Sequence, residues 1–155
     1  MTTIHIIAIG KNKDAWVSEG IAHYTKLLGR WSKVEWTLLT PRRTSNTDPK
    51  SVRKAEAELL LPKLTHRPVI ALADNGKSLD TSAFTKQLAM WQTNGGGRFT
   101  FVIGGPFGLD PSVVSAADTA VSLSPLTFSH QVVRLVLLEQ LYRGFSILHN
   151  TDYHK

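Results

Sequence analysis

Apolar residues gather in short runs that are spaced regularly along the chain. The runs cover Thr3–Ile9, Val34–Leu39, Pro68–Ala73, Phe99–Ile103 and Thr119–Leu123. They are rich in β-branched and aromatic residues, and most of their consecutive positions are apolar. This pattern predicts strands that are buried on both faces. Asp74-Asn75-Gly76 is expected to end the third strand.

Segments with helical spacing of apolar residues lie between these runs. They are Asp14–Leu28, Asp48 to about Leu61, Thr81 or Ser82 to Trp91, a short helix opened by Asp110-Pro111, and Thr127–Phe145. Asp48 is expected to cap its helix, with Pro49 at the first helical position. Strands that alternate with helices predict an α/β fold with a mostly parallel sheet covered by helices, in a single domain over residues 1–155.

Parallel sheets of this kind bind ligands beyond the carboxyl ends of their strands. Here those ends are Ala73-Asp74, Ile103-Gly104 and Leu123-Ser124. The sequence therefore predicts a ligand site formed by three loops that are far apart along the chain.

Composition and charge narrow the class of protein. The chain has 155 residues, of which 42% are hydrophobic, and no cysteine, so disulfide bridges and thiolate zinc sites are excluded. The formal net charge is +6, which favours a polyanionic partner, with nucleic acid first. The apolar run near the N-terminus is too short for a membrane span, so we expect a cytoplasmic protein without a membrane partner.

The glycine-rich loop after Ile103 matches neither of two familiar phosphate-binding motifs. A dinucleotide fingerprint would need glycines where Pro106 and Leu109 stand. A phosphate loop ending in Gly76-Lys77-Ser78 would need a glycine where Ala71 stands. The loop is either a tight turn only, or a place where a neutral or cationic ligand approaches the backbone.

The longest predicted helix carries charged residues at helical spacing. His130 and Arg134 are four residues apart, as are Glu139 and Arg143. Taken singly, each pair is explained by ordinary structure, such as a helix-start histidine or a surface ion pair.

Taken together, "FVIGGPFGL", "LSPLTFSHQVVRLVLLEQLYRGFSI" and the tail "YHK" resemble the RlmH-type enzymes of the SPOUT class. The resemblance covers the whole chain, including the start "IHIIAIGKNKDAW". It implies S-adenosylmethionine-dependent methylation of N3 of a pseudouridine in large-subunit ribosomal RNA. It also implies a C-terminal trefoil knot and a homodimer that shares its active site.

The resemblance assigns the cofactor to the three loops at the strand ends. The implied contacts are Leu72, Gly104, Gly105, Leu123, Ser124, Pro125, Leu126, Thr127 and Phe128. The family usually has proline before the histidine, and this chain has Ser129.

The acceptor N3–H is a weak acid that must lose its proton, so the reaction needs a base or a positive field. The candidates are His130, Arg143, Tyr153 and His154. We prefer Arg143 as the group that stabilises the anion, with the tail closing over the base, and leave the general base open. His149 and His154 do not form a convincing metal site, so no metal is expected.

Basic residues near the second loop are candidates for phosphate contacts. They are Arg42, Arg43, Lys50, Arg53 and Lys54, although Glu56 and Glu58 follow and one solvated face is the simpler interpretation. Two other functions stay open. One is a non-catalytic RNA- or ribosome-binding factor on the same fold, and the other is a nucleotide-binding enzyme that uses Gly76-Lys77-Ser78.

Overall fold

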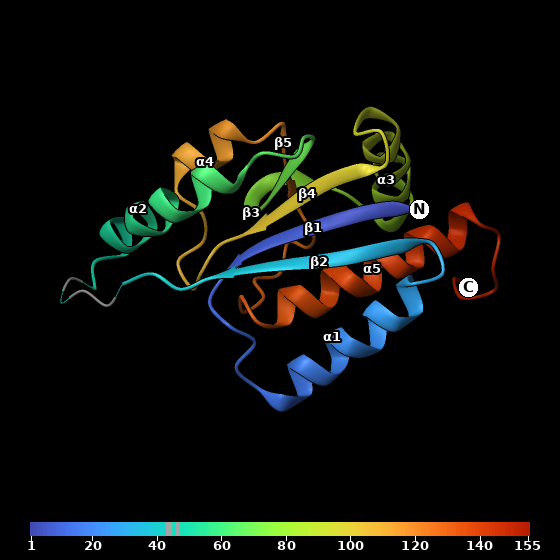
Figure 1. Ribbon diagram of the computed structural model, residues 1–155, viewed down its shortest axis with the longest axis horizontal. Helices are drawn as coiled ribbons and strands as arrows, with labels where there is room; N and C mark the ends of the chain where they lie inside the picture. Colours follow the sequence, from blue (N-terminus) through green and yellow to red (C-terminus); the bar gives the residue numbers. More distant parts are fainter. Residues whose placement is uncertain (43–44, 46) are drawn as a thin grey trace.

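The protein is a five-stranded parallel sheet with helices on both faces (Figure 1). The structure is a computed structural model that describes residues 1–42, 45 and 47–155. The strands lie in the order β2-β1-β4-β3-β5, and every pair of neighbours is parallel. The predicted α/β class is therefore confirmed, and the knot stays a prediction.

The strands and helices follow one another along the chain as expected. The strands are β1 (Thr2–Ile9), β2 (Ser32–Leu39), β3 (Val69–Ser78), β4 (Arg98–Ile103) and β5 (Thr119–Ser122). The helices are α1 (Ala15–Leu28), α2 (Pro49–Leu60), α3 (Thr81–Asn94), α4 (Pro111–Ala116) and α5 (Val132–Leu148), with a 3-10 turn at Leu61–Lys63 after α2.

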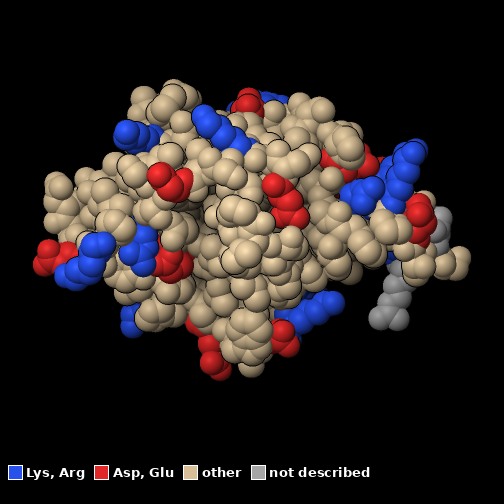
Figure 2. All heavy atoms as spheres, turned by 180° about the vertical axis from the view of Figure 1, so that it is seen from behind, with Lys and Arg blue, Asp and Glu red and all other residues tan. Residues whose placement is uncertain are grey.

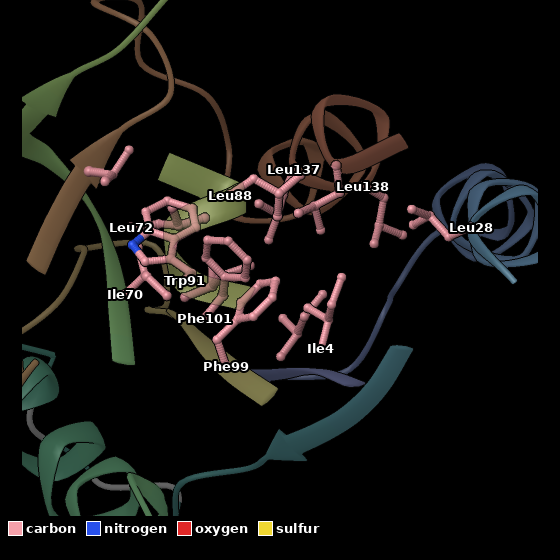
Figure 3. Close-up of a cluster of buried hydrophobic side chains, with 14 of the residues drawn as sticks. Ile4, Leu28, Ile70, Leu72, Leu88, Trp91, Phe99, Phe101, Leu137 and Leu138 are labelled. Atoms are coloured by element: carbon pink, nitrogen blue, oxygen red, sulfur yellow. The ribbon is translucent and has the colours of Figure 1, made fainter. Parts of the chain in front are cut away.

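The two faces of the sheet bury separate apolar clusters. Helices α1, α3 and α5 cover one face, where Phe99 and Phe101 pack with Trp91 and Leu137 (Figure 3). Helices α2 and α4 cover the other face, where Ile7 and other residues of the opposite strand face are buried. Because β1 sends alternate residues into both clusters, its sequence is apolar at nearly every position.

Aspartate side chains begin three of the helices. Asp48 Oδ2 accepts a hydrogen bond from the Ser51 N–H at 3.1 Å, and Pro49 follows at the first helical position, as predicted. Asp110 caps α4 in the same way. The cap of α3 is Asp80, which accepts from the Ala83 N–H at 2.8 Å, so the expectation of Thr81 or Ser82 was wrong by one residue or two.

Two expected boundaries also differ from the structure. Strand β3 does not end at Asp74 but runs to Ser78, with a register shift between Leu72 and Lys77 where it pairs with β5. Gly76 passes so close to β5 that a Cβ there would lie 2.7 Å from the Val121 backbone. Lys77 therefore belongs to a paired strand, and Gly76-Lys77-Ser78 does not form a phosphate loop.

Helix α5 begins at Val132 rather than at Thr127. The polar segment before it forms its own turns, in which Ser124 Oγ accepts from the Leu126 N–H at 2.9 Å. Ser129 Oγ accepts from the Val132 N–H at 3.1 Å, so the serine that replaces the family's proline satisfies a donor at the helix start. The segment between β5 and α5 is therefore a loop with turns of its own and not the first part of the helix.

Candidate active site

A cavity of about 740 Å³ opens at the carboxyl edge of the sheet. It lies between the stretch of β3 from Leu72 to Asn75, where the register shifts, and the loops after β4 and β5, which are the three segments that the sequence singled out. The lining includes Leu72, Gly104, Gly105, Leu123, Ser124, Leu126, Thr127, Phe128 and His130 from the predicted set. Pro125 is exposed and is not among the lining residues.

The glycine loop is both a tight turn and a wall of this cavity. Gly105 and Gly108 form an isolated bridge, with the Gly108 N–H donating to the Gly105 carbonyl at 3.0 Å. A Cβ at Gly104 would lie 2.6 Å from the Gly108 carbonyl oxygen. The chain itself therefore demands glycine at position 104, and the same close turn leaves the backbone facing the cavity.

His130 lies at the cavity and is held neutral. Burial lowers the pKa of its imidazole, and the positive charges of Arg134 and Lys13 lower it further. A neutral imidazole can accept a proton at neutral pH. This makes His130 a competent base at the place where a ligand would bind.

Arg134 connects the start of α5 to the loop after β1. Its side chain is completely buried, and burial lowers the pKa of its guanidinium. It donates to the Ile9 carbonyl at 2.7 Å, to Asn12 Oδ1 at 2.8 Å and to the His130 carbonyl at 3.1 Å. These three hydrogen bonds from Arg134 connect the His130 backbone to the end of β1 and the loop that follows it.

The other catalytic candidates gather near the far end of α5. Arg143 donates to Glu139 Oε1 from Nη2 at 2.6 Å, and its Nη1 lies 3.0 Å from His154 Nδ1. The Tyr153 hydroxyl donates to the same Glu139 oxygen at 3.0 Å, and its ring lies 4.8 Å from the Arg143 guanidinium carbon. We call Glu139, Arg143, Tyr153 and His154 the tail cluster.

Charge in the tail cluster fixes the protonation of two members. The hydrogen bond to Glu139 is the main cause that raises the pKa of Arg143, so the guanidinium stays charged. Burial and then the bond to Glu139 raise the pKa of Tyr153, so its phenol stays protonated. Arg143 is therefore a fixed cation of the cluster.

The two groups of candidates lie at opposite ends of α5 within one chain. Val133, which lines the cavity, and Arg143 are separated by ten positions of one helix. At a rise of 1.5 Å per residue this is about 15 Å along the axis. One chain therefore does not bring His130 and the tail cluster together.

One of the predicted RNA-contacting residues reaches the cavity. Arg42, Lys50 and Lys54 are exposed, and Arg53 lines the cavity mouth, whereas Arg43 lies outside the described residues. Acidic and basic side chains are mixed near the grey residues in Figure 2. The patch is thus only moderately basic, and its role stays a prediction.

The interpretation of this part of the chain as one solvated face is wrong for Glu56. Its side chain is only 4% exposed and lies against Gly105. Its position four residues before the buried Leu60 puts it on the inner stripe of α2, a signal that helical spacing contained. Glu58, two residues later, is exposed as expected.

Replacing Glu56 by glutamine is expected to change the pH dependence of folding. Burial raises the pKa of Glu56, so the native state holds the proton more tightly than the unfolded chain does. Its contribution to stability is present below the unfolded pKa, about 4.3, and is lost as the pH rises through the native value. Urea unfolding of both proteins from pH 4 to pH 8 should therefore show the free energy of unfolding of the variant rising relative to that of the wild type as the pH rises. Parallel curves would contradict this prediction.

The described residues contain neither a cluster of metal ligands nor a helix suited to span a membrane. No group of three or more His, Cys, Asp or Glu residues is arranged to hold a metal ion there. No helix in that part of the chain is both long and apolar enough to cross a membrane.

Comparison with known proteins agrees with this geometry. The family model described as "Predicted SPOUT methyltransferase" matches residues 2–154. The chain is 38% identical over 157 residues to the ribosomal RNA large subunit methyltransferase H of Streptococcus suis, covering 98% of this chain and 99% of that one. It is 40% identical over 159 residues to the protein of the same name from an Exiguobacterium species, with the same coverage.

Solved structures show the same fold at low sequence identity. A probable methylase family protein from Haemophilus influenzae gives a TM-score of 0.61 at 13% identity, covering 98% of this chain and 70% of that one. A probable methyltransferase from Bordetella pertussis gives 0.61 at 15% identity, covering 92% and 96%. With the family match over nearly the whole length, these comparisons confirm the resemblance seen in the motifs, and the chain belongs to the SPOUT methyltransferase family.

Proposed function

We propose that the protein methylates N3 of a pseudouridine in large-subunit ribosomal RNA on the assembled ribosome, with S-adenosylmethionine as methyl donor. The observation that carries the proposal is the cavity at the carboxyl edge of the sheet, formed by three loops and bordered by a neutral His130. The near-full-length relatives named as ribosomal RNA methyltransferases supply the substrate class. A single domain, a trefoil knot and a cytoplasmic location are parts of the same proposal.

The residues around the cavity suit this cofactor. A volume of about 740 Å³ falls within the range of small-molecule sites. The cofactor would be held by Leu72, the Gly104-Gly105 backbone and the loop from Leu123 to Phe128. Asp74 also lines the cavity and offers a carboxylate to a cationic ligand. When bound, the cofactor supplies the methyl group, and the protein supplies orientation and electrostatics.

His130 and Arg143 divide the work on the acceptor base. The N3–H of the base is acidic enough to be removed by a neutral imidazole that is correctly placed. His130 is neutral and would take this proton. Arg143 is a fixed cation and would stabilise the negative charge that develops on the imide, while Tyr153 offers a ring for stacking on the base.

These roles require two subunits. Because His130 and the tail cluster lie at opposite ends of α5, the tail that completes one cavity would come from the partner in a homodimer. A two-fold dimer gives two such sites, since each chain offers a cavity to its partner's tail. Two tryptophans are candidates to line the dimer surface, since Trp16 is 55% exposed and Trp31 stacks on His149 at 5.1 Å next to the tail.

Labelled methyl transfer tests the function. S-adenosylmethionine with a labelled methyl group is incubated with ribosomes from cells that lack this protein, and the modified nucleotide is identified by mass spectrometry. The proposal expects label at N3 of one pseudouridine in large-subunit RNA. Cofactor binding without label on RNA would point to another acceptor, and neither binding nor label would favour the alternative, a non-catalytic ribosome-binding factor.

The basic residues on α2 give a further prediction. Replacing both Lys50 and Lys54 by alanine is expected to weaken ribosome binding about tenfold at moderate salt, because two exposed cations near the cavity would no longer meet phosphates. The slope of log affinity against log salt should also become shallower by about 2. Sedimentation binding assays at several salt concentrations measure both. Replacing the exposed Lys86 on α3 is the matched control, and an unchanged slope in the double variant would contradict the prediction.

A further inference from the structure

The side chain of Glu56 lies directly behind the glycine loop of the cavity. A Cβ built on Gly105 would lie 2.5 Å from Glu56 Oε2 and 3.1 Å from Oε1. Gly105 lines the cavity, whereas Glu56 does not. The carboxylate therefore supports the loop from the side that faces away from the ligand.

The Glu56 carboxylate packs against the backbone of Gly105. The hydrogen bond from Gly105 stabilises the charged form of Glu56, although burial outweighs it and raises the pKa of the carboxyl group. The Gly104–Gly105 peptide is trans, so its carbonyl points opposite to its N–H. A Gly105 N–H that faces Glu56 therefore leaves the Gly104 carbonyl on the opposite side of the peptide, away from α2.

A buried carboxylate is unfavourable unless something compensates for it. Glu56 Oε1 finds no hydrogen-bond partner among the described residues, so this carboxylate is not fully satisfied by the fold. Most carboxylates with so little exposure are paired with a cation or fully hydrogen-bonded. A destabilising group behind a ligand-binding loop is what a functional constraint produces.

We propose that Glu56 is a positioning residue of the cofactor site, which orients the Gly104–Gly105 peptide so that the Gly104 carbonyl accepts a hydrogen bond from an N–H group of the ligand. The inference rests on the proposed function, because it assumes that the cavity binds S-adenosylmethionine. It gives Glu56, which does not line the cavity, a role in ligand recognition. Without the carboxylate the peptide is free to rotate, and the acceptor is lost from the cavity.

Calorimetric binding of S-adenosylhomocysteine and steady-state kinetics test the inference on the full-length protein. Glu56→Ala is expected to raise both the Kd of this ligand and the KM for S-adenosylmethionine about tenfold, the effect of one hydrogen bond, with a much smaller change in kcat. Glu56→Gln keeps an acceptor oxygen and should bind within about threefold of wild type. Glu58→Ala, an exposed neighbour on the same helix, is the matched control and should bind as wild type does.

Folding and geometry are checked separately. If Glu56→Ala does not fold, Glu56→Asp is used, since its shorter side chain should withdraw from Gly105 and raise the Kd in the same direction. Gly105→Ala should lower stability less in the Glu56→Ala background than in wild type, because the colliding carboxylate is gone. A Kd equal to wild type in a folded Glu56→Ala protein would overturn the positioning role alone. No binding by the wild type would overturn the proposed function, and this inference with it.

Discussion

Replacing Arg143 by alanine is expected to lower methyl transfer at least about 100-fold, with cofactor affinity within about twofold of wild type. The guanidinium is a fixed cation, since its hydrogen bond to Glu139 raises its pKa. Losing a preorganised donor to a developing anion typically lowers kcat by two to three orders of magnitude. The cavity itself should be untouched, because Arg143 does not line it.

Two further variants separate charge from shape in the tail cluster. Arg143→Lys keeps the charge but loses the forked donor that reaches both Glu139 and His154, so we expect it to recover only part of the activity. Removing residues 152–155 takes away Tyr153 and His154 and should give a loss of similar size. Lys155→Ala is the matched control within the same tail. Activity of Arg143→Ala near the wild-type level would remove this residue from the mechanism.

Replacing Arg134 by methionine is expected to lower the free energy of unfolding by about 3 kcal/mol. The two side chains are similar in length, so the change mainly removes hydrogen bonds. Three buried acceptors, the carbonyls of Ile9 and His130 and the side chain of Asn12, then lose their donors. Removing a buried charge offsets part of this loss, but each unsatisfied buried acceptor costs about 1–3 kcal/mol.

The same substitution should alter His130. The charge of Arg134 is one cause of the lowered pKa of His130, so the acidic limb of the pH–rate profile should move to higher pH in the variant. Thermal or urea unfolding measures the stability, and a pH–rate profile measures the second effect. Replacing the exposed Arg98 by methionine is the control. Wild-type stability in Arg134→Met would show that these bonds contribute nothing net.

Local patterns predicted most of the fold because the strong signals were short-range. The apolar run Ile6–Ile9 of β1 reflects a strand buried on both faces, and Asp48-Pro49 marks a helix start in the structure as it does in the sequence. The strand past Asp74 was missed because pairing with β5 outweighs the turn preference of Asp-Asn-Gly. That pairing depends on a contact about 45 residues away, and no local signal carries it.

The sequence predicted which segments line the site, but neither the buried residue behind them nor the separation of the two groups of catalytic candidates. Strand ends located Leu72, Gly104 and Leu123, and parallel topology required them to lie at one edge. The burial of Glu56 was missed because a charged residue on a helix is usually solvated. The separation of His130 from Arg143 follows from the length of α5, which became clear only with its bounds.

Mixing two inactive variants tests the shared active site most directly. Gly104→Val should distort the glycine loop that forms one wall of the cavity, since even a Cβ there would lie 2.6 Å from the Gly108 carbonyl oxygen. The second variant lacks residues 152–155 and keeps its cavity. Unfolded together and refolded as a mixture, the two chains form mixed dimers in which one cavity and one tail are intact. A shared site predicts that methyl transfer returns to about one quarter of the wild-type level, from random pairing in a two-fold dimer. Activity that stays at the level of the separate variants, with mixed dimers demonstrated by mass spectrometry, would contradict a site built from two subunits.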